Sequence, residues 1–143
     1  MERMPGSRRW YRGCYAVGVM TIDHDDITRE VSRLIRDFTE AFDARDADAL
    51  DRHYVTGAVV VPVPGHPLTG DAAKAAKRHV MERGMPIHAE LRRVYHSGDV
   101  ALALTDWRIG DPDDGGFAGT ATDVLRRVDG RWRYVIDNPF GTA

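Results

Sequence analysis

The sequence is poor in cysteine and in long apolar runs. Cys14 is its one cysteine, which excludes an intramolecular disulfide and is typical of a reducing compartment, so we expect a cytoplasmic location. No stretch of about 18 apolar residues occurs, so we expect no segment that crosses a membrane. The 20 basic and 22 acidic residues give a net charge of −2. Without an excess of positive charge we expect no nucleic-acid partner.

The common catalytic and cofactor motifs are also missing. The sequence has no nucleophile elbow, no P-loop, no dinucleotide-binding fingerprint and no paired cysteine and histidine. Its six histidines show neither the H-x-H nor the H-E-x-x-H spacing that places two metal ligands side by side. We therefore expect neither a metal nor a cofactor.

What is present is the composition of a globular domain. The chain has 143 residues, of which 43% are hydrophobic and 29% charged, and this length is enough for one domain with a substantial core. We expect that domain over residues 21–143, after a poorly ordered extension over residues 1–20. The extension has a basic start and a short apolar patch, CYAVGVM, at the lower limit of a secretory signal. No A-x-A cleavage site follows, so export is the less favoured alternative.

Three helices are predicted in the first part of the domain. Apolar residues recur at spacings of three and four over about residues 26–44, which indicates one amphipathic helix. Asp46 is expected to cap a second, short helix in ARDADALDRHY. The third is predicted over DAAKAAKRHVMERG, which starts with an aspartate cap, Asp71, and ends at Gly84.

Strands dominate the second part. They are predicted over residues 58–63, 87–96, 100–109, 117–128 and 131–138. Prolines 62 and 64 place the end of the first strand on an edge of the sheet, and PGHPLTG is predicted as a loop. Helices followed by a run of strands are typical of the α+β class, in which the helices cover one face of an antiparallel sheet.

The segment VALALTDWRI, residues 100–109, carries apolar side chains at positions of both parities. A sheet covered by helices on one face normally leaves its second face polar. We therefore expect the second face to be covered as well, and predict a homodimer through the sheet.

At this point the chain resembles a known family. Over about residues 26–141 it has a helix ending F-x-x-x-F-D-A-R-D-A-D-A-L, a loop ending L-T-G and a last strand G-R-W-R-Y-V-I-D-N-P. These features are similar to the NTF2-like superfamily, and within it to the SnoaL-like and DUF4440 groups and the ketosteroid isomerases. The resemblance implies a cone, with a curved antiparallel sheet wrapped around about three N-terminal helices. It also implies a mostly apolar internal pocket for a small apolar or cyclic organic ligand.

The resemblance can be carried over residue by residue. Ketosteroid isomerases use a tyrosine on the first helix, a basic carboxylate on the first strand and a protonated aspartic acid on the penultimate strand. The matching positions here are Phe38, Val61 or Pro62, and Asp123. Phe38 has no hydroxyl, and neither Val61 nor Pro62 can accept a proton, so steroid isomerisation is excluded. By resemblance, Asp123 points into the pocket.

The predicted strand pairing extends this site. Asp106 and Arg108 are expected on the cavity side of the neighbouring strand, although they could equally form a structural ion pair with each other. On the last strand, one face carries Trp132, Tyr134, Ile136 and Asn138, and it is taken to face the cavity. Asp137 has the opposite parity, so we expect it on the outer face or at the strand end. Predicted to be catalytic are Asp123 and Asp106; predicted to bind ligand are Arg108, Asn138, Tyr54, Tyr134, Trp132, Phe38 and His66, the last at the pocket mouth.

Three functions are compatible with this site. The first is a cofactor-independent proton-transfer enzyme, an isomerase, cyclase, dehydratase or hydrolase, acting on a cyclic or polyketide-like carbonyl compound. The second is a non-catalytic protein that binds a small molecule in the same pocket. The third is a dimeric association domain, because this fold hosts enzymes, binding modules and assembly domains alike.

Overall fold

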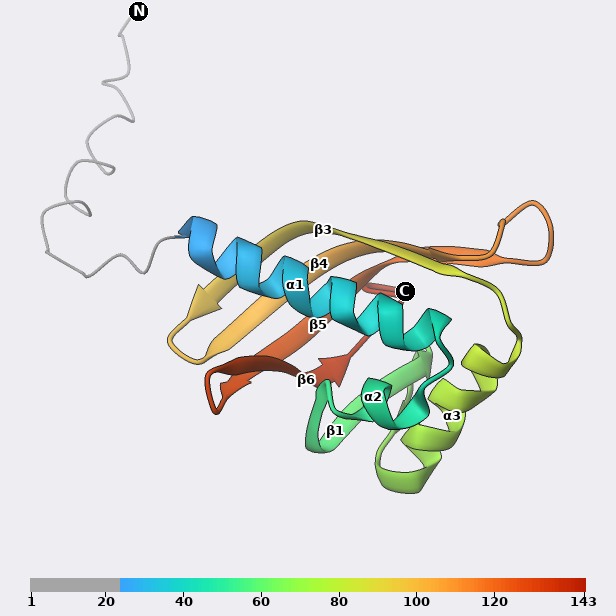
Figure 1. The fold of residues 1–143 in the computed structure, drawn as a ribbon, viewed down its shortest axis with the longest axis horizontal. Helices are drawn as coiled ribbons and strands as arrows, with labels where there is room; N and C mark the ends of the chain where they lie inside the picture. Colours follow the sequence, from blue (N-terminus) through green and yellow to red (C-terminus); the bar gives the residue numbers. More distant parts are fainter. Residues whose placement is uncertain (1–23) are drawn as a thin grey trace, which may run out of the picture.

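The computed structural model describes residues 24–143, which fold into helices packed on one curved sheet (Figure 1). The extension predicted over residues 1–20 lies outside the described residues. Within residues 24–143, no helix is long and apolar enough to cross a membrane.

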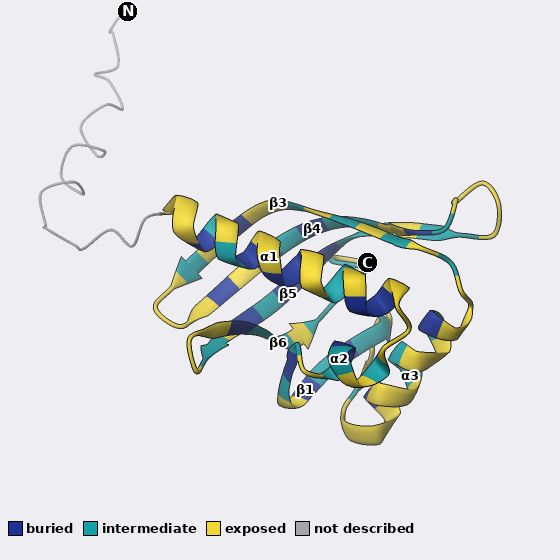
Figure 2. Cartoon of the chain, viewed as in Figure 1, coloured by how far each residue is buried: buried dark blue, intermediate teal, exposed yellow. Residues whose placement is uncertain are grey.

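The three predicted helices are present, as α1 (His24–Asp43), α2 (Ala47–Asp51) and α3 (Gly70–Glu82). Helix α1 turns its apolar stripe toward the sheet and its polar face to solvent (Figure 2). Asp46 caps α2 as predicted, because its side chain accepts a hydrogen bond of 2.9 Å from the backbone N–H of Ala49. The predicted cap of α3 is wrong: Asp71 lies inside the first turn, and the capping position is Thr69, whose side chain makes no capping hydrogen bond.

Six strands form a single sheet with the order β2-β1-β6-β5-β4-β3. Their bounds are β1 (Tyr54–Val63), β2 (His66–Leu68), β3 (Ile87–Ser97), β4 (Val100–Ile109), β5 (Phe117–Val128) and β6 (Arg131–Asp137). The last four strands form the antiparallel meander that the sequence predicts. The sheet as a whole is mixed rather than antiparallel, since β1 runs parallel to β6.

Strand β1 differs most from its prediction. It starts at Tyr54, four residues earlier than expected, and it is not an edge strand. The short strand β2, predicted as part of a loop, pairs beyond it through Val60 and Leu68. The pairing is irregular between Val60 and Val63, and Pro62 falls within this interval, where a missing N–H donor is tolerated.

A bulge in β6 changes which side chains face inward. Tyr134 pairs with Leu125, but Ile136 pairs with Val124, so β6 has one more residue than β5 over this interval. Such a bulge reverses the alternation of a strand. Trp132 and Tyr134 are buried before the bulge, whereas Ile136 after it is 36% exposed. The prediction that Ile136 shares an inward face with Tyr134 is therefore wrong.

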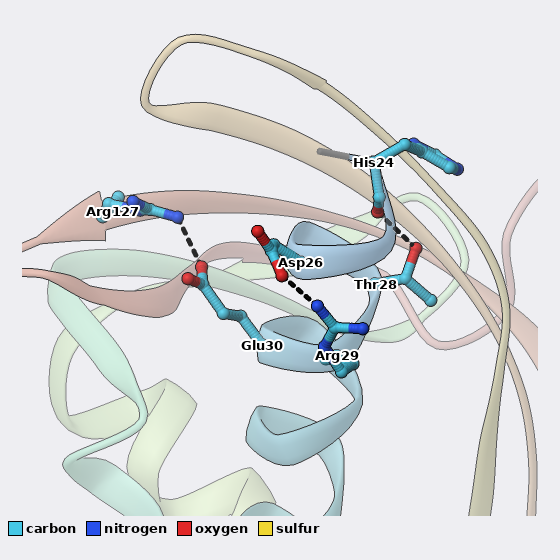
Figure 3. Close-up of polar contacts among 6 residues, drawn as sticks. All are labelled: His24, Asp26, Thr28, Arg29, Glu30 and Arg127. Atoms are coloured by element: carbon cyan, nitrogen blue, oxygen red, sulfur yellow. Dashed lines mark hydrogen bonds and ion pairs between the residues drawn. The ribbon is translucent and has the colours of Figure 1, made fainter. Parts of the chain in front are cut away.

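Polar contacts attach the N-terminal half of α1 to the end of β5 and the start of β6, beside the turn that joins these strands. Glu30 pairs with Arg127 of β5 (Figure 3). It also accepts a hydrogen bond of 2.8 Å from the indole N–H of Trp132 in β6. Nearby on the same helix, Asp26 pairs with Arg29 at the surface. These contacts hold α1 across the concave face of the sheet and leave the opposite end of the cone, near α2 and α3, to form a cavity.

Candidate active site

A cavity of about 160 Å³ lies between the second half of α1, helices α2 and α3, and the inner face of the sheet. This is close to the size of a cavity that holds a benzene-sized molecule, about 150 Å³. Most of its wall is apolar and includes Phe38, Leu50, Trp107 and Phe140. Polar atoms reach it from Tyr54, Lys77, Thr105, Asp123, Tyr134 and Asp137.

Two carboxyl groups, Asp123 on β5 and Asp137 on β6, lie next to each other on the cavity wall. Val124 pairs with Ile136, and the N–H of Thr122 donates to the carbonyl of Asn138 at 3.0 Å, which places the two aspartates opposite one another. Side chains in such positions lie roughly 5 Å apart at Cβ. The prediction that Asp137 lies on the outer face or at the strand end is wrong, because the β6 bulge turns it inward.

One oxygen atom of each carboxyl group already accepts a hydrogen bond from the protein. Asp123 is 4% exposed, and its Oδ1 accepts a hydrogen bond of 2.9 Å from the backbone N–H of Asn138. Asp137 accepts through Oδ2 a hydrogen bond of 2.5 Å from the hydroxyl of Tyr54. The other oxygen of each carboxyl group is left for a proton or a ligand.

The environment separates the two groups electrostatically. Burial, and then the nearby charge of Asp137, raise the pKa of Asp123 well above its usual value. Burial also raises the pKa of Asp137, but the Tyr54 hydrogen bond and the charge of Lys77 act against this rise. These surroundings favour the protonated form more strongly at Asp123 than at Asp137.

Three aromatic rings pack beside the carboxyl groups. Tyr54 and Tyr134 stand side by side on β1 and β6, with ring centroids 5.2 Å apart, and Phe38 lies 5.5 Å from Tyr134. Lys77 of α3 places its Nζ 3.6 Å from the centroid of the Tyr54 ring and 2.7 Å from Asp51 Oδ1. The position expected from the isomerases for a helix tyrosine is thus occupied by Phe38, and the phenol comes from β1 instead.

Asp106 and Arg108 do not belong to the cavity, and their predicted location is wrong. Asp123 pairs across the strands with Ala103, so the inward positions of β4 are odd-numbered and Asp106 faces outward. There it forms hydrogen bonds with Arg92 and Thr120, which lower its pKa. Arg108 is exposed on the same outer face, next to His88.

Three other predicted ligand-binding residues also lie elsewhere. Asn138 donates from its side chain to Thr122 Oγ1 and to the carbonyl of Gly141, and it reaches the site through its backbone N–H alone. Trp132 is buried in the core, and its indole N–H donates to the partly exposed Glu30. His66 is exposed on β2. Of the predicted set, the structure brings Asp123, Tyr54, Tyr134 and Phe38 to the cavity.

Lys77 and Thr105 are cavity residues that sequence reasoning missed. Lys77 lies on an amphipathic helix among other charged residues, so its sequence context contains no signal. Thr105 lies at an inward, odd-numbered position of β4, but the sequence alone does not show which parity of this strand is inward, because both parities carry apolar residues. Among residues 24–143 there is no group of three or more histidine, cysteine, aspartate or glutamate side chains arranged to hold a metal ion.

The fold and the cavity together define a class: a small α+β domain whose curved mixed sheet and helices enclose an internal cavity with acid groups on its wall. The chain belongs to the SnoaL-like domain family, which it matches over residues 35–135. No curated protein matches the sequence.

Solved structures confirm the predicted NTF2-like fold. An NTF-2 like protein of unknown function from Shewanella oneidensis MR-1 has a TM-score of 0.68 at 20% identity, over 78% of this chain and 96% of that one. A provisionally assigned scytalone dehydratase from Novosphingobium aromaticivorans DSM 12444 has 0.61 at 18%, over 78% and 81%. A provisionally assigned calcium/calmodulin-dependent protein kinase type II association domain from Thiobacillus denitrificans ATCC 25259 has 0.63 at 21%, over 77% and 93%. At these identities the likeness extends to the fold alone.

Proposed function

We propose that this protein binds a small cyclic carbonyl compound in its cavity and transfers protons on it without a cofactor. The observation that carries the proposal is the pair of adjacent carboxyl groups, Asp123 and Asp137, on the wall of an otherwise apolar cavity. Carboxyl groups whose environments assign them different protonation states are the usual parts of an acid–base site. The single cysteine is compatible with the cytoplasm, the location that we also propose.

The two aspartates have complementary roles in this proposal. Asp137, as the carboxylate, removes a proton from the carbon next to the carbonyl group, and the C–H electron pair forms the carbon–carbon double bond of an enol. Asp123, as the neutral acid, gives its proton to the carbonyl oxygen at the same time. Asp137 is then protonated and Asp123 ionised, so the charge of the pair is unchanged.

The second half of the cycle determines the reaction type. In both outcomes the enol oxygen returns its proton to Asp123 and the carbonyl group forms again. If the substrate has a second double bond, the enol is a dienol, and return of the Asp137 proton to its far carbon gives isomerisation. If a hydroxyl group on the next carbon leaves as water with the proton of Asp137, the result is dehydration. The dehydratase assignment of one structural neighbour is compatible with the second outcome, and Tyr54 holds Asp137 in place for both.

The test is hydrogen–deuterium exchange next to a ketone, followed by NMR. Cyclohexanone in D2O, with and without protein, reports removal of the α-proton directly and requires no knowledge of the natural substrate. The wild-type protein should accelerate exchange, and Asp137→Asn should reduce the acceleration by about 100-fold or more. Asp123→Asn should also reduce it, because the carbonyl oxygen loses its acid.

Asp106→Asn is the matched control, since it removes a carboxylate from the outer face of the same sheet. It should leave exchange unchanged. An equal loss in the Asp106 and Asp137 variants would exclude the proposed role of the cavity pair. Binding of cyclohexanone without any exchange would instead favour the non-catalytic ligand-binding protein.

A second candidate function, association through the sheet, rests on a different observation. One cross-strand row on the outer face is apolar, namely Tyr95, Leu102, Val124 and Ile136 on four adjacent strands. Tyr95 is 53% and Leu102 40% exposed, and large exposed apolar side chains in a contiguous row favour a protein interface. We propose that this row forms the homodimer interface, which is compatible with both functions.

A further inference from the structure

One buried hydroxyl group in the cavity has no hydrogen-bond partner. Among residues 24–143, three buried side-chain atoms are without a partner: His96 Nδ1, Thr105 Oγ1 and Arg127 Nε. Of these residues, Thr105 is the one that lines the cavity. Its side chain is buried, with 5% of the residue exposed.

The surroundings explain why the protein does not satisfy this hydroxyl. Thr105 pairs with Leu91 on one side and with Ala121 on the other, and neither side chain can form a hydrogen bond. Trp107 is at the next inward-facing position of β4. Its indole N–H already donates to the carbonyl of Pro139 at 2.7 Å, so it does not serve Thr105. Buried polar groups are rarely left unpaired unless they have a role.

The immediate neighbours of Thr105 would hold a trapped water molecule poorly. Internal waters typically make about three hydrogen bonds. Apart from the hydroxyl itself, the cross-strand neighbours of Thr105 offer only apolar side chains at this place. An oxygen atom that belongs to a larger ligand is held in place by the rest of that ligand. It therefore needs only one hydrogen-bond partner from the protein, so a ligand is the better match.

The pairing of β4 with β5 determines how far Thr105 lies from Asp123. Ala121, its cross-strand partner, lies two residues before Asp123 on the same face of β5. Thr105 and Asp123 are therefore diagonal neighbours, with Cα atoms roughly 7–8 Å apart. Two oxygen atoms on opposite sides of a six-membered ring are roughly 5 Å apart, so hydrogen bonds that reach both from the side of the sheet, along the lone-pair directions, span a similar distance.

We infer that the ligand of this cavity is a ring compound with two oxygen functions, a reacting carbonyl at Asp123 and a second carbonyl or hydroxyl group bound by Thr105 Oγ1. The threonine hydroxyl can both donate and accept, so it fits either group. Thr105 is then a specificity-determining residue that selects dioxygenated rings over rings with one oxygen. The inference rests on the proposed function for the ketone next to Asp123.

The experiment compares two ketones that differ at one position. Cyclohexane-1,4-dione has a second carbonyl opposite the first, and 4-methylenecyclohexan-1-one has a carbon–carbon double bond of similar shape there. NMR titration of the wild-type protein should give a dissociation constant about fivefold lower for the dione, the effect of one net hydrogen bond. Thr105→Val should abolish this preference, and Thr105→Ser, which restores the hydroxyl, should retain it.

A matched control is Thr120→Val. Thr120 is on the outer face of β5, where its hydroxyl donates to Asp106 at 2.8 Å, so the preference for the dione should be unaffected. A second measurement needs no ligand. Because Thr105→Val removes an unpaired hydroxyl, it should raise the midpoint of thermal unfolding by roughly 3 °C, whereas Thr120→Val should not raise it.

Two outcomes would overturn the inference. One is equal affinity of the wild-type protein for the two ketones, including no measurable binding of either. The other is a preference for the dione that survives in Thr105→Val. Exchange measured on the same samples separates this from the proposed function: exchange with no preference refutes the role of Thr105 alone, and a Thr105-dependent preference without exchange refutes proton transfer alone.

Discussion

The hydroxyl of Tyr54 donates a hydrogen bond of 2.5 Å to Asp137, although the two residues are 83 positions apart in the sequence. The parallel pairing of β1 with β6 brings them together. The bond holds one oxygen of Asp137 and stabilises its ionised form, whereas Asp123 opposite has no side-chain donor. This asymmetry distinguishes the base from the acid in the proposed mechanism.

The first prediction concerns this hydrogen bond. In Tyr54→Phe the ring remains but the donor is lost, so the pKa of Asp137 should rise because one of the two influences that lower it is gone. A base with a higher pKa is ionised only at higher pH. The acidic limb of the pH–rate profile for α-proton exchange should therefore move to higher pH.

Tyr95→Phe is the control for this prediction, since Tyr95 is exposed on the outer face. Its pH–rate profile should coincide with that of the wild-type protein. A Tyr54→Phe profile that also coincides with the wild type would mean that Asp137 is not the base.

The second prediction concerns stability and pH. The pKa of Asp123 is raised in the folded protein, so between about pH 3.9, its unfolded value, and the folded value the native state binds more protons than the unfolded state. Over that window the ionisable group costs stability as the pH rises. Asp123→Asn cannot ionise, so relative to the wild type it should gain stability from pH 4 to pH 7, measured by urea unfolding.

Asp106→Asn should behave in the opposite way. Hydrogen bonds with Thr120 and Arg92 lower the pKa of Asp106, so its stabilising effect is present above about pH 3.9 and is lost as the pH falls. Its difference from the wild type should therefore shrink toward acidic pH. A pH-independent difference between Asp123→Asn and the wild type would mean that folding does not raise the pKa of Asp123.

The third prediction concerns the attachment of α1 to the sheet (Figure 3). Glu30→Ala removes the acceptor of Trp132 and the partner of Arg127, and should lower the free energy of unfolding by about 1 kcal/mol. The higher helix propensity of alanine offsets a few tenths of this. Asp26→Ala breaks a pair in which both side chains are more than half exposed, and should change stability by less than about 0.5 kcal/mol. Equal effects would mean that Glu30 is not a tertiary contact.

The fourth prediction concerns the outer face of the sheet. Leu102 is at the centre of the apolar row and 40% exposed. Leu102→Arg should convert the proposed dimer to a monomer in sedimentation, with little effect on the fold, because the side chain faces away from the core. A wild-type protein that sediments as a monomer would exclude the interface.

The sequence predicted the strands best where turn residues delimit them. The bounds of β4 and β5 agree with the predicted residues 100–109 and 117–128. Strand β2 was missed because it has only three residues, one of them Pro67, and so contains too little pattern. The parallel partner of β1 could not be predicted, because local sequence does not determine which distant strand lies beside it.

Which face of a strand is inward was harder to predict than the strand itself. Strand β4 has apolar residues at both parities, and its face became known only through the pairing of Ala103 with Asp123. This is why Asp106 was placed in the cavity. Asp137 was excluded for a related reason, since strict alternation from Tyr134 predicts that it faces outward and only the bulge reverses this.

The bulge in β6 also affects how the residues of this domain are aligned with those of its relatives. A relative could carry an aspartate in the column of Asp137 and yet, with a regular β6, turn it to solvent and place an aliphatic side chain in the cavity. Conversely, one residue gained or lost in this strand would interchange the two positions. Identity at an aligned column is then a poor guide to shared chemistry in this family, and the backbone at residues 134–136 has to be compared first.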